Sequence, residues 1–353
     1  MSVSVAMCTH NGAAFVQAQL DSILAQTRLP DEIVVVDDCS CDATWKILER
    51  VAATSKVAVR LFQNSRQLGI THNFEKAISL TTGEVVFLSD QDDLWHANKV
   101  ETMMAEFSAR PDLWFLHTDA RLVDKAGESL GSGLMSALEM TVPERRRIHA
   151  GSPFDVYIRR NLATGATAAL RRELFNSARP FPDDWLHDEW LAIIGAASGR
   201  TDFLEQQLVD YRQHDTNHMG IQPASMSVKL NRMFTRRGDF HRRNVRKLRQ
   251  LNTHLLLMGA PSSRLKAIGG KLKHAQARRS LTANRSARLP IIAREMASGR
   301  YWKWSSGLRS MLRDLVESIP AQASERMPAD RTDQHFDPTM SADHARGSKP
   351  PRS

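Results

Sequence analysis

The 353-residue sequence predicts an α/β fold, a mostly parallel and doubly wound sheet flanked by helices, with a basic helical C-terminal extension. Short apolar, β-branched segments alternate with segments whose apolar residues recur at helical spacing. The connections between them are short, which is typical of parallel strands joined by crossover helices. A marked excess of Lys and Arg in residues 229–313 indicates the extension.

The alternation begins at the N-terminus. The run VSVAMCT predicts a buried strand at 3–9, and further strands are predicted at 32–38, 57–64 and 85–90. Between these strands, helices are predicted at 15–26, 43–53 and 72–80. In the first helix one apolar face should pack on the sheet; its members are Phe15, Leu20, Ile23 and Leu24.

The middle of the chain mixes elements. The expected ones are a strand at 113–124, a loop or short helix at 133–147, a strand at the end of 162–170, a helix at 186–199, and strand, turn and strand over 201–214. Farther on, helical spacing relates Val245, Leu248, Leu251 and Leu255. We therefore expect an α/β domain at 1–222, the basic helical extension at 223–320 and, because large apolar residues are few, a disordered tail at 321–353.

The net charge of +9 is unevenly distributed along the chain. Residues 1–228 carry 21 Lys/Arg and 30 Asp/Glu, whereas residues 229–313 carry 22 Lys/Arg and only two Asp/Glu. The basic segment suits an anionic membrane surface, where Leu255 to Met258, Trp302 and Trp304 could enter the interface. A solvated extension without a partner is the alternative. Nucleic-acid binding is disfavoured because no aromatic-interleaved motif or zinc finger is found.

Cysteine content and hydropathy indicate the compartment. Three cysteines, Cys8, Cys39 and Cys41, are too few and too close for a disulfide framework, so a reducing environment is expected. The N-terminus has no signal-peptide pattern, and no run of 18 or more apolar residues occurs. We expect a cytoplasmic protein, peripheral on the inner face of the plasma membrane if the basic segment binds there.

Polar residues gather where the predicted strands end. Thr9-His10-Asn11, Asp37-Asp38 and Asp90 to Asp93 each lie at or just after a strand, so they should face one crevice. The last group suits Mg²⁺ or Mn²⁺, which prefer oxygen ligands. Simpler interpretations are a solvated turn, a helix cap near Leu94, or an Asx-turn after Asp37-Asp38.

These motifs together resemble the inverting family-2 glycosyltransferases with a GT-A fold, which use nucleotide-sugar donors. The resemblance covers residues 1–220 and rests on VSVAMCTHNG, LDSILAQT, EIVVVDDCSCDAT, NSRQLGITHNFEKAI and TTGEVVFLSDQDDLWHANKV. The segment SDQDDLW and the later segments HDEW and YRQH are most similar to the rhamnosyltransferase-like branch, which acts on surface polysaccharide or lipopolysaccharide. Residues 1–222 would then be the GT-A catalytic domain.

The resemblance implies roles residue by residue. Thr9 and Asn11 would lie by the nucleotide, and Asp38 with Asp37 would bind its base and ribose. Asp90-Gln91-Asp92 matches the DXD motif. Asp92 would be the best metal ligand, and Asp90 would contact both the metal and the donor. The adjacent Asp93 is a further candidate metal ligand. Asp188 stands where the family keeps its general base, with Glu189 as second candidate. Arg212 and His214 could contact the diphosphate, because Arg pairs well with phosphate oxygens.

Two departures from the family pattern stand out. Cys39 occupies a position before Ser40 where Gly is usual, which makes a positive φ there less accessible. The late motif of processive members is absent, and Tyr211 to His214 stand near its place. The expected reaction is therefore a single inverting transfer to a saccharide or lipid-linked saccharide.

Two other functions are compatible with paired aspartates on an α/β sheet. A sugar nucleotidyltransferase needs a glycine-rich first loop with a basic residue, and the loop CTHNGAAF has one Gly and no Lys or Arg. A non-catalytic nucleotide-binding module at the membrane should lack the acids of one site, and all three acidic sites are present. Both functions are disfavoured on these grounds.

Overall fold

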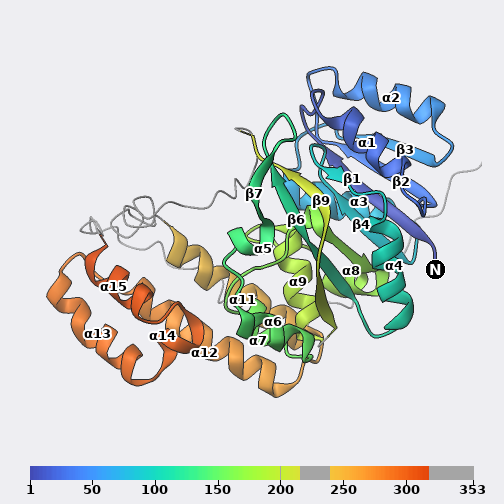
Figure 1. Cartoon of the computed structure of the whole chain (residues 1–353). Coiled ribbons are helices and arrows are strands. Elements are labelled where there is room, and N and C mark those ends of the chain that lie inside the picture. The colour runs from blue at the N-terminus through green and yellow to red at the C-terminus, as the bar shows by residue number, and fades with distance from the viewer. Residues whose placement is uncertain (199, 215–238, 318–353) are drawn as a thin grey trace, which may run out of the picture.

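The computed structural model describes residues 1–198, 200–214 and 239–317 (Figure 1). The predicted tail at 321–353 and the first part of the predicted extension, 223–238, lie outside the described residues. The described part is an α/β domain followed by a helical extension, as the sequence predicted.

The first half of the sheet is parallel. Its strands are β1 (Val3–Thr9), β2 (Glu32–Asp37), β3 (Ala58–Gln63) and β4 (Val85–Ser89). They lie in the order β3-β2-β1-β4, and all three pairings between them are parallel. Each of the four predicted strands is therefore found, and their carboxyl ends meet at one edge of the sheet.

The second half of the sheet is mixed. It is formed by β5 (Leu94–Trp95), β6 (Phe115–Val123), β7 (Ser129–Gly133), β8 (Ala168–Arg171) and β9 (Thr201–Arg212). Strand β8 is antiparallel to both β4 and β6, whereas β6 and β9 are parallel. The insertion of β8 beside β4 brings residues 161–165 next to the ends of β1 and β4.

Helices cover both faces of the sheet. One core contains Val5, Ile33 and Phe87, and it packs under α1 (Val16–Leu24), α2 (Thr44–Thr54) and α4 (Lys99–Ala109). The other contains Ala6 and Val34, and it packs under α3 (Ile70–Leu80), α8 (Arg172–Ala178) and α9 (His187–Ala197). Alternate residues of each strand thus enter opposite cores, as in a doubly wound sheet. Short helices close the remaining side: α5 (Leu134–Ala137), α6 (Val142–His149), α7 (Phe154–Tyr157) and the 3₁₀ turn Gly165–Thr167.

Three local predictions were wrong. No helix begins near Leu94; this residue starts β5, which pairs with β9. Residues 201–212 form one continuous strand, and its polar stretch 205–207 is an irregularity in the pairing with β6, not a turn. Phe15 precedes α1 and is only half-buried, so it does not share the core face of Leu20 and Ile23.

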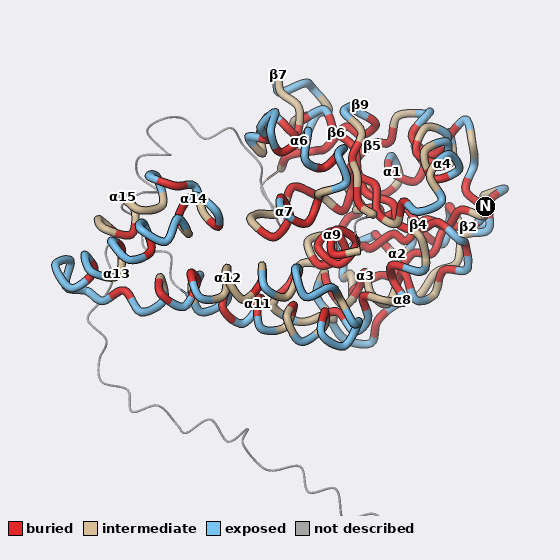
Figure 2. The backbone as a smooth tube through the Cα atoms, turned by 90° about the horizontal axis from the view of Figure 1, so that it is seen from below, coloured by how far each residue is buried: buried red, intermediate tan, exposed pale blue. Residues whose placement is uncertain are grey.

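The extension is helical throughout its described part. It comprises α11 (Phe240–Leu257), α12 (Ser262–Arg279), α13 (Arg285–Ala297), α14 (Arg300–Trp304) and α15 (Leu308–Val316). Helix α11 buries the four predicted residues Val245, Leu248, Leu251 and Leu255. The two views show α13 to α15 projecting from the sheet as an arm carried by α11 and α12 (Figures 1 and 2). None of the helices described is long and apolar enough to cross a membrane.

Candidate active site

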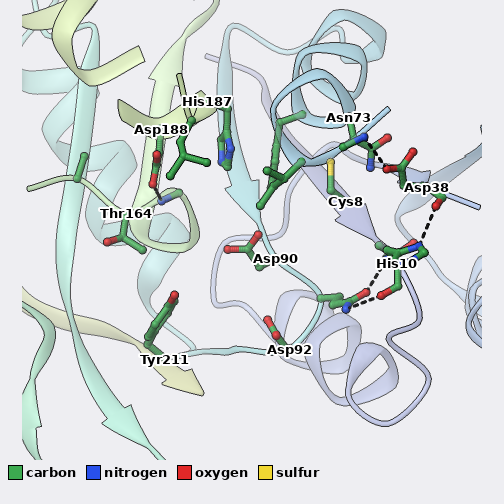
Figure 3. Close-up of a pocket in the computed structure, with 18 of the residues that line it drawn as sticks. Cys8, His10, Asp38, Asn73, Asp90, Asp92, Thr164, His187, Asp188 and Tyr211 are labelled. Carbon is green, nitrogen blue, oxygen red and sulfur yellow. Dashed lines mark hydrogen bonds between the residues drawn. The ribbon is translucent and has the colours of Figure 1, made fainter. Parts of the chain in front are cut away.

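A cleft of about 720 Å³ opens at the carboxyl ends of β1, β2 and β4 (Figure 3). Its walls come from the loops after these strands, the N-terminus of α3, the segment 161–165, the first turn of α9 and the end of β9. Of the residues predicted to form the site, the cleft is lined by Thr9, Asn11, Asp38, Asp90, Asp92, Asp188 and His214. The remaining four, Asp37, Asp93, Glu189 and Arg212, are not among its lining residues.

Gln91 fixes the loop that carries Asp90 and Asp92. Its side-chain oxygen accepts a hydrogen bond from the main-chain N–H of His10 at 2.8 Å, and its amide nitrogen donates to the His10 carbonyl at 3.0 Å. The loops after β1 and β4 are therefore joined across the floor of the cleft. The residue is the middle position of the DXD motif, and the sequence suggested no role for it. Only its pairing in three dimensions shows that it has a function of its own.

Asp90 and Asp92 lie close together in the cleft, with Asp188 facing them from α9 (Figure 3). Burial raises the pKa of Asp90 to about 8, and the charges of Asp92 and Asp188 contribute to the rise. Among the described residues, no hydrogen-bond donor reaches the Asp90 carboxylate. Asp92 accepts a hydrogen bond from His214, Nε2 to Oδ2, at 2.7 Å. His214 in turn stacks on Phe15, with the ring centroids 4.9 Å apart.

This arrangement fits a divalent cation. Two carboxylates on one loop, one of them without a donor in the described part of the chain, offer hard oxygen ligands of the kind that Mg²⁺ and Mn²⁺ prefer. A cation would also offset the repulsion from Asp92 and Asp188, which adds to the effect of burial on the pKa of Asp90. Asp90 and Asp92 are therefore the residues suited to hold a metal.

Asp93 and Arg212 point away from the cleft. The Asp93 side chain is only 2% exposed and accepts a hydrogen bond from the Arg212 main-chain N–H at 3.0 Å. Burial raises its pKa well above the usual range, with Asp92 and Asp90 adding to the rise. The Arg212 guanidinium donates to the carbonyls of Asp92, at 2.9 Å, and Lys125, at 2.8 Å. Both residues thus stabilise the DXD loop on the side that faces away from the cleft.

Tyr211 lines the cleft in place of Arg212, and its hydroxyl is directed into it (Figure 3). Successive residues of a strand face opposite sides, so Tyr211 and Arg212 cannot both reach the cleft. That periodicity was available in the sequence, but the predicted turn within 201–214 left the orientation of this strand open. Tyr211 was therefore missed.

Asp38 is the acid that the second strand presents to the cleft. Its carboxylate accepts hydrogen bonds from Asn64 Nδ2 at 2.7 Å and from the main-chain N–H groups of Leu68 and Gly69 at 2.8 and 2.9 Å. Asn64 is itself bonded to Asn73, which also lines the cleft. These bonds hold the Asp38 carboxylate in one orientation at the edge of the site.

Asp37 has a structural position instead. It is fully buried and accepts hydrogen bonds from Thr9 Oγ1 at 2.8 Å, from the Ser40 main-chain N–H at 2.9 Å and from Ser40 Oγ at 2.5 Å. These contacts tie the end of β1 to the turn after β2. Cys39 adopts a φ of 61° in this turn although it is not glycine, and its thiol lies 3.0 Å from the Asn64 carbonyl. The turn therefore keeps the left-handed conformation that the family's usual Gly would favour.

Asp188 sits in the first turn of α9 and is held by two main-chain groups. Its carboxylate accepts hydrogen bonds from the N–H of Gly165 at 3.0 Å and of Glu189 at 2.6 Å. Burial raises its pKa to about 6, and the neighbouring Glu189 adds to the rise. A carboxylate with this pKa is ionised at neutral pH and can still accept a proton.

Glu189 turns toward the extension. Its side chain forms an ion pair with Lys247 of α11, whose ammonium also lies 4.5 Å from the centre of the Trp185 ring. Trp185 and Trp190 are buried in the core, so neither presents a stacking face to the cleft. In the first turn of α9, Asp188 therefore lines the cleft and Glu189 contacts the basic extension.

His187 is a further cleft residue that sequence reasoning left without a role. Its ring stacks on Phe74 with centroids 3.8 Å apart, and burial lowers its pKa to about 3. Gly165 permits this packing, because a Cβ there would lie 2.5 Å from His187 Nε2. The neutral ring thus lies against Gly165, the residue whose main-chain N–H binds Asp188.

Comparison with known proteins identifies relatives of this architecture. Residues 4–177 match the model of Glycosyl transferase family 2. The chain is 23% identical over 263 residues to dTDP-rhamnosyl transferase RfbG of Shigella flexneri, an alignment that covers 69% of this chain and 83% of the relative. It is 26% identical over 198 residues to UDP-Glc:alpha-D-GlcNAc-diphosphoundecaprenol beta-1,3-glucosyltransferase WfgD of Escherichia coli, covering 54% and 69%.

The fold also has a match among solved structures. The crystal structure of S. aureus TarS 1-349 in complex with UDP-GlcNAc superposes with a TM-score of 0.53 at 20% identity, covering 78% of this chain and 72% of that one. At that identity the likeness concerns the fold alone.

Proposed function

The chain belongs to glycosyltransferase family 2 and has a GT-A fold, and from this premise we propose that it catalyses a metal-dependent, inverting sugar transfer. The donor is a nucleotide-sugar, and the acceptor is a hydroxyl of a saccharide or lipid-linked saccharide. The observation that carries the proposal is that Asp90 and Asp92, suited to a cation, share one cleft with Asp188, suited to a base. We keep residues 1–222 as the catalytic domain and 223–320 as the basic extension.

The nucleotide is proposed to lie along the ends of β1 and β2. Asp38 can accept hydrogen bonds from the ribose hydroxyls or the base, since Asn64, Leu68 and Gly69 hold its carboxylate in one orientation. Thr9 and Asn11 line the same side of the cleft. Asp37 acts through Thr9 and Ser40, and so supports this site without touching the donor.

Asp92 and Asp90 are proposed to hold Mg²⁺ or Mn²⁺. The cation would supply positive charge to the diphosphate as it departs. His214 keeps the Asp92 carboxylate oriented and lies where its own ring can approach the diphosphate. Arg212 and Asp93, which were expected to contact diphosphate and metal, are reassigned here as supports of the loop.

Asp188 is proposed as the general base. An acceptor hydroxyl is a weak nucleophile, and a carboxylate within hydrogen-bond reach can take its proton while the oxygen attacks the anomeric carbon. The two main-chain N–H groups that bind Asp188 fix its direction into the cleft. A single displacement of this kind inverts the anomeric configuration. Glu189 is held by Lys247 and is not proposed as the base.

The relatives suggest the finer assignment. RfbG is named as a dTDP-rhamnosyl transferase, and WfgD as an enzyme that acts on a diphosphoundecaprenol-linked sugar. By this similarity we propose rhamnose as the donated sugar, a lipid-linked saccharide as acceptor, and a role in cell-surface polysaccharide synthesis. A location on the inner face of the plasma membrane would agree with the basic extension.

A donor panel tests the proposal. Nucleoside diphosphate release is measured with Mn²⁺ for dTDP-, UDP- and GDP-linked sugars, with and without a lipid-linked saccharide acceptor. We expect turnover with one donor class, dTDP-rhamnose first, and its loss in Asp92→Ala. No turnover with any donor, together with nucleotide binding that is unchanged in Asp92→Ala, would contradict the proposal.

A further inference from the structure

The last two described helices expose large apolar side chains to solvent. Trp302 of α14 is 49% exposed, and Leu308 and Leu312 of α15 are 58% and 48% exposed. The two leucines are four residues apart on α15, so they lie on the same face of the helix. Single exposed apolar residues are ordinary, but three that share one surface need an explanation.

These three residues form one patch. A Cβ placed on Gly307 would lie 3.3 Å from Cδ1 of Trp302, so the indole covers the residue that directly precedes Leu308. Gly307 has a φ of 55° and allows the chain to turn sharply between the two helices. The turn brings Trp302 to the start of α15, and the patch continues from there to Leu312.

The patch is surrounded by positive charge. Lys303 and Arg309, the neighbours of Trp302 and Leu308 in the chain, are both exposed. Residues 239–317 contain 18 Lys/Arg and four Asp/Glu, a net of +14. Three of those acids, Glu295, Asp314 and Glu317, are buried, and two of them pair with Arg300 and Arg278. Apolar side chains within a basic surface are complementary to an anionic lipid leaflet.

The patch is also connected to the rim of the cleft. Arg309 forms an ion pair with Glu139 at 3.9 Å, and the preceding residue, Leu138, lines the cleft. Arg159 donates a hydrogen bond to the Ser305 carbonyl at 3.2 Å. Arg159 itself lies two residues before Asn161, which also lines the cleft. The helices that carry the apolar patch therefore touch two segments of the cleft wall.

We propose that Trp302, Leu308 and Leu312 form a membrane foot that inserts into the interface of an anionic bilayer and holds the cleft next to lipid-borne acceptors. The second half of this statement rests on the proposed glycosyl transfer, whereas insertion itself does not. The foot is narrower than the apolar set expected from the sequence. Leu255 and Trp304 are buried and cannot reach a membrane. Leu256 and Leu257 are exposed, but they belong to the end of α11, where His254 contacts the Ser177 carbonyl of α8, and not to α14 or α15.

The test is vesicle binding by the full chain. Co-sedimentation is measured with vesicles of phosphatidylglycerol and phosphatidylcholine mixed in a 3:7 ratio, and with pure phosphatidylcholine. The wild type should bind the anionic vesicles, and Trp302→Ser/Leu308→Ser/Leu312→Ser should lower the partition coefficient by at least about tenfold. Leu29→Ser, at an exposed leucine of the catalytic domain, is the matched control and should bind as the wild type does.

Three results would overturn the membrane foot. One is no binding by the wild type, and another is equal binding by the triple variant. The third is a change in the sedimentation mass of the triple variant without a change in vesicle binding, which would show that a second copy covers the patch. Folding of each variant is checked by its thermal unfolding. Because vesicle binding needs no turnover, failure of the foot and failure of the proposed reaction give separate outcomes.

Discussion

The side-chain amide of Gln91 pairs with both main-chain groups of His10, at 2.8 and 3.0 Å. This double hydrogen bond joins the loops after β1 and β4, which carry the residues proposed to bind the nucleotide and the metal. Gly12 lies against the same amide, and a Cβ there would come within 2.2 Å of Gln91 Oε1. The geometry of the DXD loop therefore depends on a residue outside its two aspartates.

Substitutions at these two positions should be coupled. Gly12→Ala displaces the Gln91 side chain and Gln91→Ala removes it, so each should lower kcat/KM by about tenfold or more by misplacing Asp90 and Asp92. In the double variant the added methyl group has space, and its loss should be close to that of Gln91→Ala alone. A double-mutant cycle on diphosphate release measures the coupling. Fully additive losses would show that the two residues act independently.

Asp92 and Asp93 are adjacent but should behave differently. Asp92→Asn removes a proposed ligand and should weaken Mn²⁺ binding by about 10- to 100-fold. Asp93→Asn should change it by less than about twofold, because this carboxyl is buried, accepts a hydrogen bond from the Arg212 main chain and does not line the cleft. The Mn²⁺ dissociation constants of the two variants and of the wild type are measured by titration calorimetry. Equal weakening by both substitutions would place Asp93 at the metal.

The pH dependence should report Asp188. Its pKa is raised to about 6, and a base must be ionised to act. Below pH 6 the logarithm of kcat/KM should therefore rise by about one per pH unit, and it should level off above. The profile is measured at saturating Mn²⁺, so that Asp90 and Asp92 remain bound to the cation. A profile that is flat between pH 5 and 8 would exclude this carboxylate as the base.

The ion pair behind Asp188 should tune that profile. Glu189 raises the pKa of Asp188 and Lys247 lowers it. Lys247→Met should consequently move the acidic limb of kcat/KM to higher pH, and Glu189→Gln should move it to lower pH. The two variants are controls for each other, since both break the same ion pair. Shifts in the same direction would indicate that the pair acts through packing and not through charge.

Much of the first half of the fold follows from local patterns in the sequence. Strands β1, β2 and β4 are buried, largely apolar runs, β3 is a half-buried one, and helices with an apolar face separate them. Both signals involve neighbouring residues only. The direction of β8 between β4 and β6 depends on pairing between residues about 50 to 85 positions apart. No local pattern specifies such pairing, and the mixed half of the sheet could not be predicted.

The site was predictable to the level of strand ends but not of side-chain direction. Asp38, Asp90 and Asp92 reach the cleft as expected, because the turn after each parallel strand faces the same edge. Asp37 and Asp93 belong to the same acidic runs, yet each is turned inward by hydrogen bonds from residues distant in the chain. Phe15 has the spacing of a core residue, but it lies outside α1 and stacks on His214 instead.

The most direct test of the central claim is the Asp188→Asn variant. Asparagine can retain the hydrogen bond from Gly165 but cannot take a proton, so donor binding should be kept while transfer falls by at least about 1,000-fold. The folded-state pKa of about 6 lies above the usual value near 4, so the ionised carboxylate opposes folding above pH 6. The variant should therefore be at least as stable as the wild type at pH 8. Donor binding by calorimetry and single-turnover transfer are measured on the same sample. Intact binding with lost transfer is the predicted result, and transfer at the wild-type rate would contradict the assignment of Asp188 as the base.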